Sequence, residues 1–173
     1  MNRNSFIKEF ASFTESSQEE LLRIEQIIKN HEIIPNTYYL MPEDAALLFI
    51  AFIASYGQSD VIERTRDIAL TVAEDLDFLL EYICRALCFC SEADDIQAIK
   101  INKEHAEAFL IYNNGSIIFK SDDSIDRNSS DFDFYDAGIL NELAKYFIVP
   151  EEMGKWPRTG YIAEIVFRLA NAW

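Results

Sequence analysis

Apolar residues recur at helical spacing in the first part of the chain. Over residues 17–30 the leucines and isoleucines fall on one face, and Ser17 with Glu20 forms a capping box at the start. Pro42 begins a second helix, because proline suits the first helical turn, and this helix ends near Gly57. Two amphipathic or buried helices are therefore expected before residue 60.

Residues 61–90 continue the helical period and are expected to break or bend near residues 74–77. Acidic residues occur there beside Leu76 and other leucines that the helix must bury, so we assign the acids to its solvent face. These acids are Glu74, Asp75, Asp77 and Glu81. The first half of the chain is predicted to be all helical.

The pattern changes at residues 91–95, which are predicted to form a turn or an acidic loop. Isoleucines then alternate with polar residues at 96–102, which predicts a strand. Two further apolar runs, 106–112 and 117–120, flank an Asn-Gly pair of the kind that forms type I′ hairpin turns. We expect an antiparallel hairpin, or a three-stranded meander over residues 96–121.

The end of the chain predicts a loop followed by two helices. Residues 121–136 are rich in Ser, Asn and Asp, which favour turns, and are expected to be an exposed loop. Asp136 then caps a helix that extends through Phe147. The last helix follows Pro157 and carries an apolar stripe that includes Trp173.

Together these elements predict an α+β fold that is mostly helical. The small antiparallel sheet lies between an N-terminal helical half and two C-terminal helices. The chain has 173 residues, half of them hydrophobic, and only 5 Gly and 4 Pro, so we expect residues 1–173 to form a single domain without a long linker.

Charge limits the partners that this fold can have. The chain carries 15 Lys and Arg against 30 Asp and Glu, a formal net charge of −15. Such a surface repels phosphate backbones and anionic lipid and attracts cationic partners. We therefore expect no direct nucleic-acid binding and no membrane association.

Location is expected to be cytoplasmic. The most apolar run, residues 45–54, is about half the ~20 residues that a membrane-spanning helix needs, and the N-terminus lacks a secretory signal. Cys84, Cys88 and Cys90 are odd in number and clustered, so they do not form a framework of paired disulfides.

A segment near residue 130 is the sharpest candidate for a binding site. It interleaves aspartates, which pair with Lys or Arg, with aromatic residues that can anchor a contact. The candidate partner-binding residues are Asp122, Asp123, Asp126, Asp131, Phe132, Asp133, Phe134, Tyr135 and Asp136. The alternative interpretation is that the acids merely solvate a loop while the aromatic side chains enter the core. The acidic helix at residues 74–81 is a second candidate surface.

No residue pattern predicts a cofactor, a metal ion or a catalytic set. The acidic segment lacks the central Gly and closing Glu of an EF-hand loop. The cysteines lack zinc-ligand partners at suitable spacing and are expected to be buried apolar side chains, and His31 and His105 each stand alone. We do not expect an enzyme.

We expect an acidic protein-binding inhibitor. The model for this function is an immunity-type protein that neutralises a basic toxin or nuclease by covering its active site, since an acidic surface accelerates encounter with a cationic one. Two alternatives remain open. One is a DNA mimic that blocks a nucleic-acid-binding protein, and the other is a small enzyme whose acid/base site is not recognisable from sequence.

Overall fold

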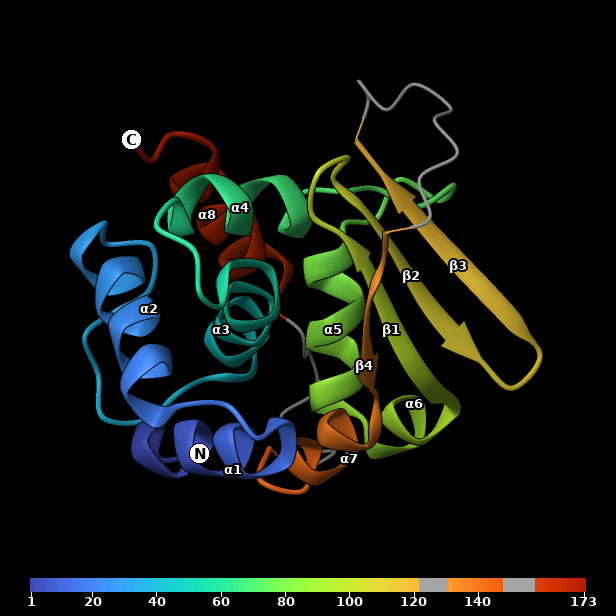
Figure 1. Ribbon diagram of the computed structural model, residues 1–173, viewed down its shortest axis with the longest axis horizontal. Coiled ribbons are helices and arrows are strands. Elements are labelled where there is room, and N and C mark those ends of the chain that lie inside the picture. Colours follow the sequence, from blue (N-terminus) through green and yellow to red (C-terminus); the bar gives the residue numbers. More distant parts are fainter. Residues whose placement is uncertain (122–130, 148–157) are drawn as a thin grey trace.

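The chain has an α+β fold in which helices lie to one side of an antiparallel sheet (Figure 1). The computed structural model describes residues 1–121, 131–147 and 158–173, except for the side chains of Cys90 and Ser91. In these residues the sheet has four strands in the order β3-β2-β1-β4. The mostly helical α+β architecture predicted from sequence is confirmed, with one strand more than expected.

Two helices form the N-terminal part. Helix α1 (Arg3–Thr14), which the hydrophobic pattern did not predict, begins at Asn2, whose side-chain oxygen accepts a hydrogen bond of 2.8 Å from Asn4 N. Helix α2 (Gln18–Asn30) begins after Ser17, as predicted. The two helices are joined by a buried ion pair between Arg3 Nε and Glu25 Oε1 at 2.9 Å.

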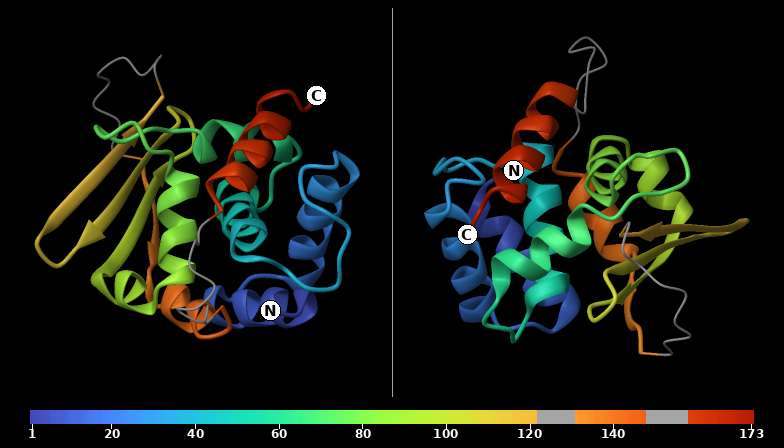
Figure 2. Two further views of the ribbon diagram at one scale, coloured as in Figure 1. Left: turned by 180° about the vertical axis from the view of Figure 1, so that it is seen from behind. Right: turned by 90° about the horizontal axis from the view of Figure 1, so that it is seen from above.

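Helix α3 (Pro42–Ser55) is the centre of the helical layer, and every one of its residues is buried. It contacts α2, α4 (Val61–Ala69) and α5 (Leu79–Cys88), and α5 lies between α3 and the sheet in both views of Figure 2. Total burial explains why α3 is apolar on all sides. Among the described residues, none of the helices combines the length and the hydrophobicity needed to cross a membrane.

The prediction that residues 74–81 form an acidic helix is wrong. Residues 70–78 form a loop between α4 and α5, and only Glu81 of the four acids lies within a helix. The loop forms because Val72 exchanges two backbone hydrogen bonds with Lys120 of the distant strand β3. Leu76, which the helix was expected to bury, is 77% exposed with a φ of 69°.

The predicted meander is present. Strands β1 (Ile96–Asn102), β2 (Glu107–Tyr112) and β3 (Gly115–Lys120) pair antiparallel in sequence order. The two-residue turn is formed by Asn113 and Asn114, neither of which has a positive φ, so it is not the expected type I′ turn. The acidic segment before β1 is a short helix, α6 (Cys90–Asp95), and not a simple turn.

The fourth strand lies in the segment predicted to be a loop. Strand β4 (Asp133–Asp136) pairs antiparallel with β1, with Tyr135 opposite Ile99 and Phe134 opposite Lys100. Its four residues are too few and too acidic to show a strand pattern, and the pairing is supplied by β1, which is more than 30 residues away in sequence.

One face of the sheet is buried and the other is not. Ile99, Leu110 and Phe119 point to the helices and have no exposed surface. The side chains at alternate positions lie on the opposite face, where Ile118 is 43% exposed and Phe134 is 62% exposed. Helices α6 and α7 contact β1 on the buried side.

Two helices follow the sheet, as predicted. Helix α7 (Gly138–Ala144) begins beside Asp136, whose Oδ1 accepts a hydrogen bond of 2.8 Å from Gly138 N. Helix α8 (Thr159–Ala170) buries its apolar stripe against the helical layer. Trp173 does not belong to that stripe, because it lies beyond the end of α8 and is fully exposed.

Candidate functional site

The structure describes only the second half of the candidate binding segment. Asp131, Phe132, Asp133, Phe134, Tyr135 and Asp136 are described, whereas Asp122, Asp123 and Asp126 lie outside the described residues. All three described aspartates are exposed. The aromatic residues divide between the two interpretations of the sequence: Phe132 packs edge-on against Phe109, and Tyr135 is half-buried, whereas Phe134 is 62% exposed.

Strand β4 holds these side chains in fixed directions. Because side chains alternate along a strand, Tyr135 points to the helical side and Phe134 points away from it. The Tyr135 hydroxyl donates a hydrogen bond of 2.9 Å to Ile53 O near the end of α3. Asp133 Oδ2 lies 2.9 Å from the Nζ atom of Lys103, in the turn between β1 and β2.

Burial affects the ionisation of Tyr135. Desolvation, with a smaller contribution from the negative charge of Asp133, raises the pKa of its hydroxyl well above the ordinary value. Tyr135 is therefore a neutral hydrogen-bond donor at physiological pH, and its role is to tie β4 to α3.

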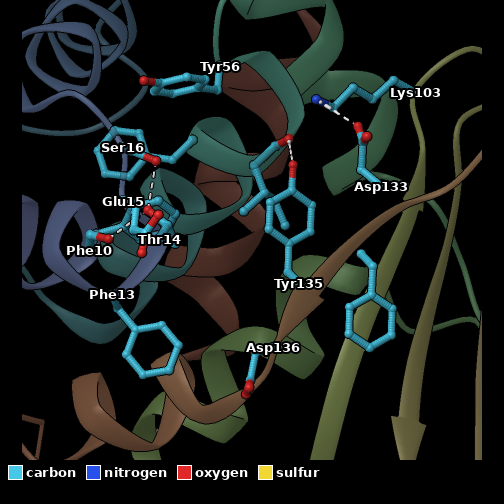
Figure 3. Close-up of a pocket in the computed structure, with 13 residues that line it drawn as sticks. Phe10, Phe13, Thr14, Glu15, Ser16, Tyr56, Lys103, Asp133, Tyr135 and Asp136 are labelled. Atoms are coloured by element: carbon cyan, nitrogen blue, oxygen red, sulfur yellow. Dashed lines mark hydrogen bonds and ion pairs between the residues drawn. The ribbon is translucent and has the colours of Figure 1, made fainter.

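A groove of about 390 Å³ lies between β4 and the ends of two helices (Figure 3). All four residues of β4 line it. The opposite wall is formed by the C-terminal ends of α1 and α3. The lining residues on that wall are Phe10, Phe13, Thr14, Glu15, Ser16, Phe52, Ile53 and Tyr56.

The groove is negatively charged for two independent reasons. Three carboxylates line it, those of Glu15, Asp133 and Asp136, against the single basic side chain of Lys103. In addition, α1 and α3 both direct their C-terminal ends at it, and neither helix has a basic residue in its last turn. Helix C-termini carry partial negative charge, so backbone and side chains together favour a cation in the groove.

Aromatic side chains lie beside this charge. Phe13 is 42% exposed and Tyr56 is 36% exposed, and both line the groove on its helical wall (Figure 3). A Cβ on Gly138 would approach the Phe13 ring to 3.0 Å, so the glycine leaves room for Phe13 at the base of the groove. Exposed aromatic faces next to carboxylates suit the aliphatic stem and charged head of Lys or Arg.

A second hollow of about 450 Å³ adjoins the groove. It is lined by Asp131, Phe132 and Asp133, together with residues of the β1–β2 turn and Arg64. The two hollows share Asp133 and Lys103, so the described half of the candidate segment borders two adjoining hollows.

The sequence did not identify the helical wall of the site. Glu15, Phe13 and Tyr56 come from the ends of α1 and α3, far from the acidic segment in sequence. The sequence around Glu15 gives little indication of a role in a site. In the structure Glu15 follows α1 and has a left-handed backbone conformation, with a φ of 55°. Only the tertiary packing of α1 and α3 brings these residues opposite β4.

The second candidate surface does not form an acidic helix face. Asp75 accepts hydrogen bonds from Asp77 N and from the Tyr82 hydroxyl, and Asp77 lies 3.3 Å from Arg85. Burial and the bond to Asp75 raise the pKa of Tyr82 to about 12. These acids organise the loop before α5.

A buried polar cluster elsewhere has a structural role. The Arg158 guanidinium forms two hydrogen bonds, of 2.9 and 3.4 Å, with the fully buried carboxylate of Glu43. The Tyr161 hydroxyl donates a 2.6 Å hydrogen bond to the neighbouring Asp44. Each acid of α3 is thus satisfied by a residue of or next to α8, which fixes the two helices together.

The described cysteines and histidines that the sequence singled out do not line the groove. Cys84 and Cys88 are buried, as expected, and the hydrogen bond with Cys88, together with burial, raises the pKa of the Cys84 thiol. His31 hydrogen-bonds to Ile27 O and Trp173 O, and His105 lies in the β1–β2 turn. Within residues 1–121, 131–147 and 158–173, no three His, Cys, Asp or Glu side chains are arranged to hold a metal ion.

Comparisons were made at three levels: protein-family models, curated proteins and solved structures. None of the three shows a significant match to this chain.

Proposed function

We propose that the protein binds a basic protein partner through the acidic groove beside β4 and acts as an inhibitor of immunity type. The partner is a toxin or nuclease whose cationic active-site region is covered by the bound inhibitor. The single observation that supports this most strongly is the agreement of two charge sources at the groove, carboxylates and helix C-termini.

The rest of the molecule supports the same kind of partner. A net charge of −15 steers cationic proteins to the surface, which raises association rates by roughly tenfold to a thousandfold at low salt. Phe134, which projects from the same strand, supplies the aromatic area that often anchors such a contact. Steering therefore comes from the whole molecule, and specificity from the groove.

The test compares two variants of equal charge. The groove variant carries Glu15→Gln, Asp133→Asn and Asp136→Asn in the groove and Asp131→Asn in the adjoining hollow. The asparagine at 136 retains an oxygen that can accept from Gly138 N. The control variant removes four exposed acids elsewhere through Glu19→Gln, Glu32→Gln, Asp94→Asn and Glu164→Gln. Both variants have the same formal charge, so any difference between them is local.

A tagged wild-type protein expressed in its native host is expected to retain one stoichiometric basic partner at low salt. With the purified partner, the groove variant should associate at least about tenfold more slowly than the control variant in stopped-flow measurements. Phe134→Ala should speed dissociation, whereas Phe167→Ala, an equally exposed phenylalanine on α8, should not. Equal association rates for the two charge variants would show that the groove is not the binding site.

Inhibition is tested separately. One equivalent of the protein should abolish the activity of the partner, and a partner that stays active when saturated would contradict the inhibitor role. Competition by an oligonucleotide for a partner that is not a nucleic-acid enzyme would instead favour a DNA mimic, because such a mimic occupies a nucleic-acid site.

A further inference from the structure

The groove is bordered by the free edge of a β-strand. Strand β4 is last in the sheet and pairs only with β1 among the described strands. Side chains of successive strand residues point to opposite faces, yet all four residues of β4 line the groove. A hollow that lies along the edge of the strand accounts for this, because both faces of the strand then border it.

The hydrogen-bond pattern identifies which backbone groups face the groove. Ala137 N donates to Gln97 O at 3.3 Å, so the odd-numbered residues of β4 direct their backbone groups toward β1. Phe134 and Asp136 therefore direct their N–H and C=O groups away from β1. Outside the pairing of β1 with β4, no described residue forms a backbone hydrogen bond with these groups.

The other edge of the sheet is different. The end of β3 is covered, because Lys120 and Val72 exchange backbone hydrogen bonds of 2.9 and 3.0 Å. Aspartates at both ends of β4 also disfavour pairing of this edge with a second copy of itself, since like charges opposite one another repel. The same aspartates favour a strand that carries Lys or Arg.

We propose that the partner enters the groove as an extended, lysine- or arginine-bearing segment that pairs with the free edge of β4 and extends the sheet to a fifth strand. This inference rests on the proposed function and specifies its binding mode: backbone hydrogen bonds to Phe134 and Asp136 hold the segment, and its cationic side chains meet the groove carboxylates. Alternate side chains of the segment face the aromatic residues of the helical wall.

The probe is a capped octapeptide of alternating lysine and valine, and the control is a capped octapeptide of paired lysines and paired prolines, which places proline on both edges of an extended chain. Both carry four positive charges, but proline lacks the N–H and the backbone freedom that a ladder needs. The lysine–valine peptide should bind at least about tenfold more tightly by calorimetry. In hydrogen-exchange NMR it should slow exchange of the Phe134 and Asp136 amides specifically.

Other results would overturn the inference. Equal affinities for the two peptides, or no protection of the β4 amides, would leave charge recognition without strand addition. Protection of β3 in place of β4, or dimerisation of the protein through β4 in sedimentation experiments, would assign the edge to another occupant.

The test also separates this inference from the proposed function. If both peptides bind equally and the groove variant loses both, cation recognition stands while strand addition fails. If the lysine–valine peptide protects β4 but the host yields no basic partner, strand addition stands and the inhibitor role fails. A partner that binds without displacing either peptide would contradict both, because it would lie outside the groove.

Discussion

The buried carboxylate of Asp44 accepts hydrogen bonds from the Tyr161 hydroxyl and from Met41 N. Removing this hydroxyl by Tyr161→Phe leaves a buried charged group short of a donor, and should lower the free energy of unfolding by about 1.5–3 kcal/mol. Chemical denaturation measures the loss. The control is Tyr146→Phe, whose exposed hydroxyl lies 3.5 Å from Glu9 Oε1 and which should cost less than about 0.5 kcal/mol.

The pH dependence of Asp44 provides a second test of the same contact. Burial raises the pKa of its carboxyl above the ordinary value, whereas the hydrogen bond from Tyr161 lowers it. The folded protein thus holds this proton to higher pH than the unfolded chain does, and stability from this group is present at low pH and lost as pH rises through the raised pKa. In Tyr161→Phe the pKa of Asp44 should rise further, measured by NMR titration. An unchanged pKa would mean that the hydroxyl does not stabilise the carboxylate.

Leu76 has an unfavourable backbone conformation for its residue type. Its φ of 69° is left-handed, which costs about 1–2 kcal/mol for most L-residues, and its side chain is largely exposed. Asparagine adopts this conformation more readily, so Leu76→Asn should stabilise the protein by about 0.5–1 kcal/mol in thermal or chemical unfolding. Leu22→Asn, an exposed leucine in α2, should instead destabilise it. Equal losses in both variants would show that Leu76 makes a stabilising contact.

Elements with complete local signals were predictable from sequence. Helices α2 and α3 carry their own starts, at Ser17 and Pro42, and the β2–β3 hairpin carries an Asn-Asn turn followed by a glycine. Where a non-local contact determines the local structure, the sequence pattern was misleading. Val72 pairs with β3, so the helical period around Leu76 did not produce a helix.

The site shows the same division. Its acids and aromatic residues could be predicted from the composition of residues 131–136, but the strand conformation could not, because β1 supplies the pairing. The helical wall needed the packing of α1 and α3. Helix α1 had a usable signal in Asn2, an N-cap residue that precedes phenylalanines at helical spacing.

At the level of elements, Tyr135 is the link between β4 and α3. Tyr135→Phe removes the hydrogen bond to Ile53 O, in the last turn of α3, where carbonyl groups lack partners within the helix. We expect a loss of about 1 kcal/mol in stability and faster hydrogen exchange for β4 amides, while β2 and β3 amides serve as the internal control. If all strands change equally, the hydroxyl stabilises the whole sheet and not this junction.

Charge acts on the molecule as a whole. With a net charge of −15, repulsion among the acids opposes folding, and the exposed ion pairs compensate little because each contributes at most about 1 kcal/mol. Salt screens both interactions, since the Debye length is about 10 Å at 0.1 M. We expect repulsion among the acids to outweigh the attraction within the ion pairs, so the melting temperature should rise when KCl is added to a low-salt buffer.

The two charge variants separate this global effect from binding. Each lacks four negative charges, so both should melt at higher temperature than the wild type at low salt and should respond less to KCl. Their partner association rates should differ nonetheless, because only one variant alters the groove. If stability falls with added KCl, native ion pairs outweigh repulsion. The charged residues would then stabilise the fold, in addition to their proposed role in attracting a cationic partner.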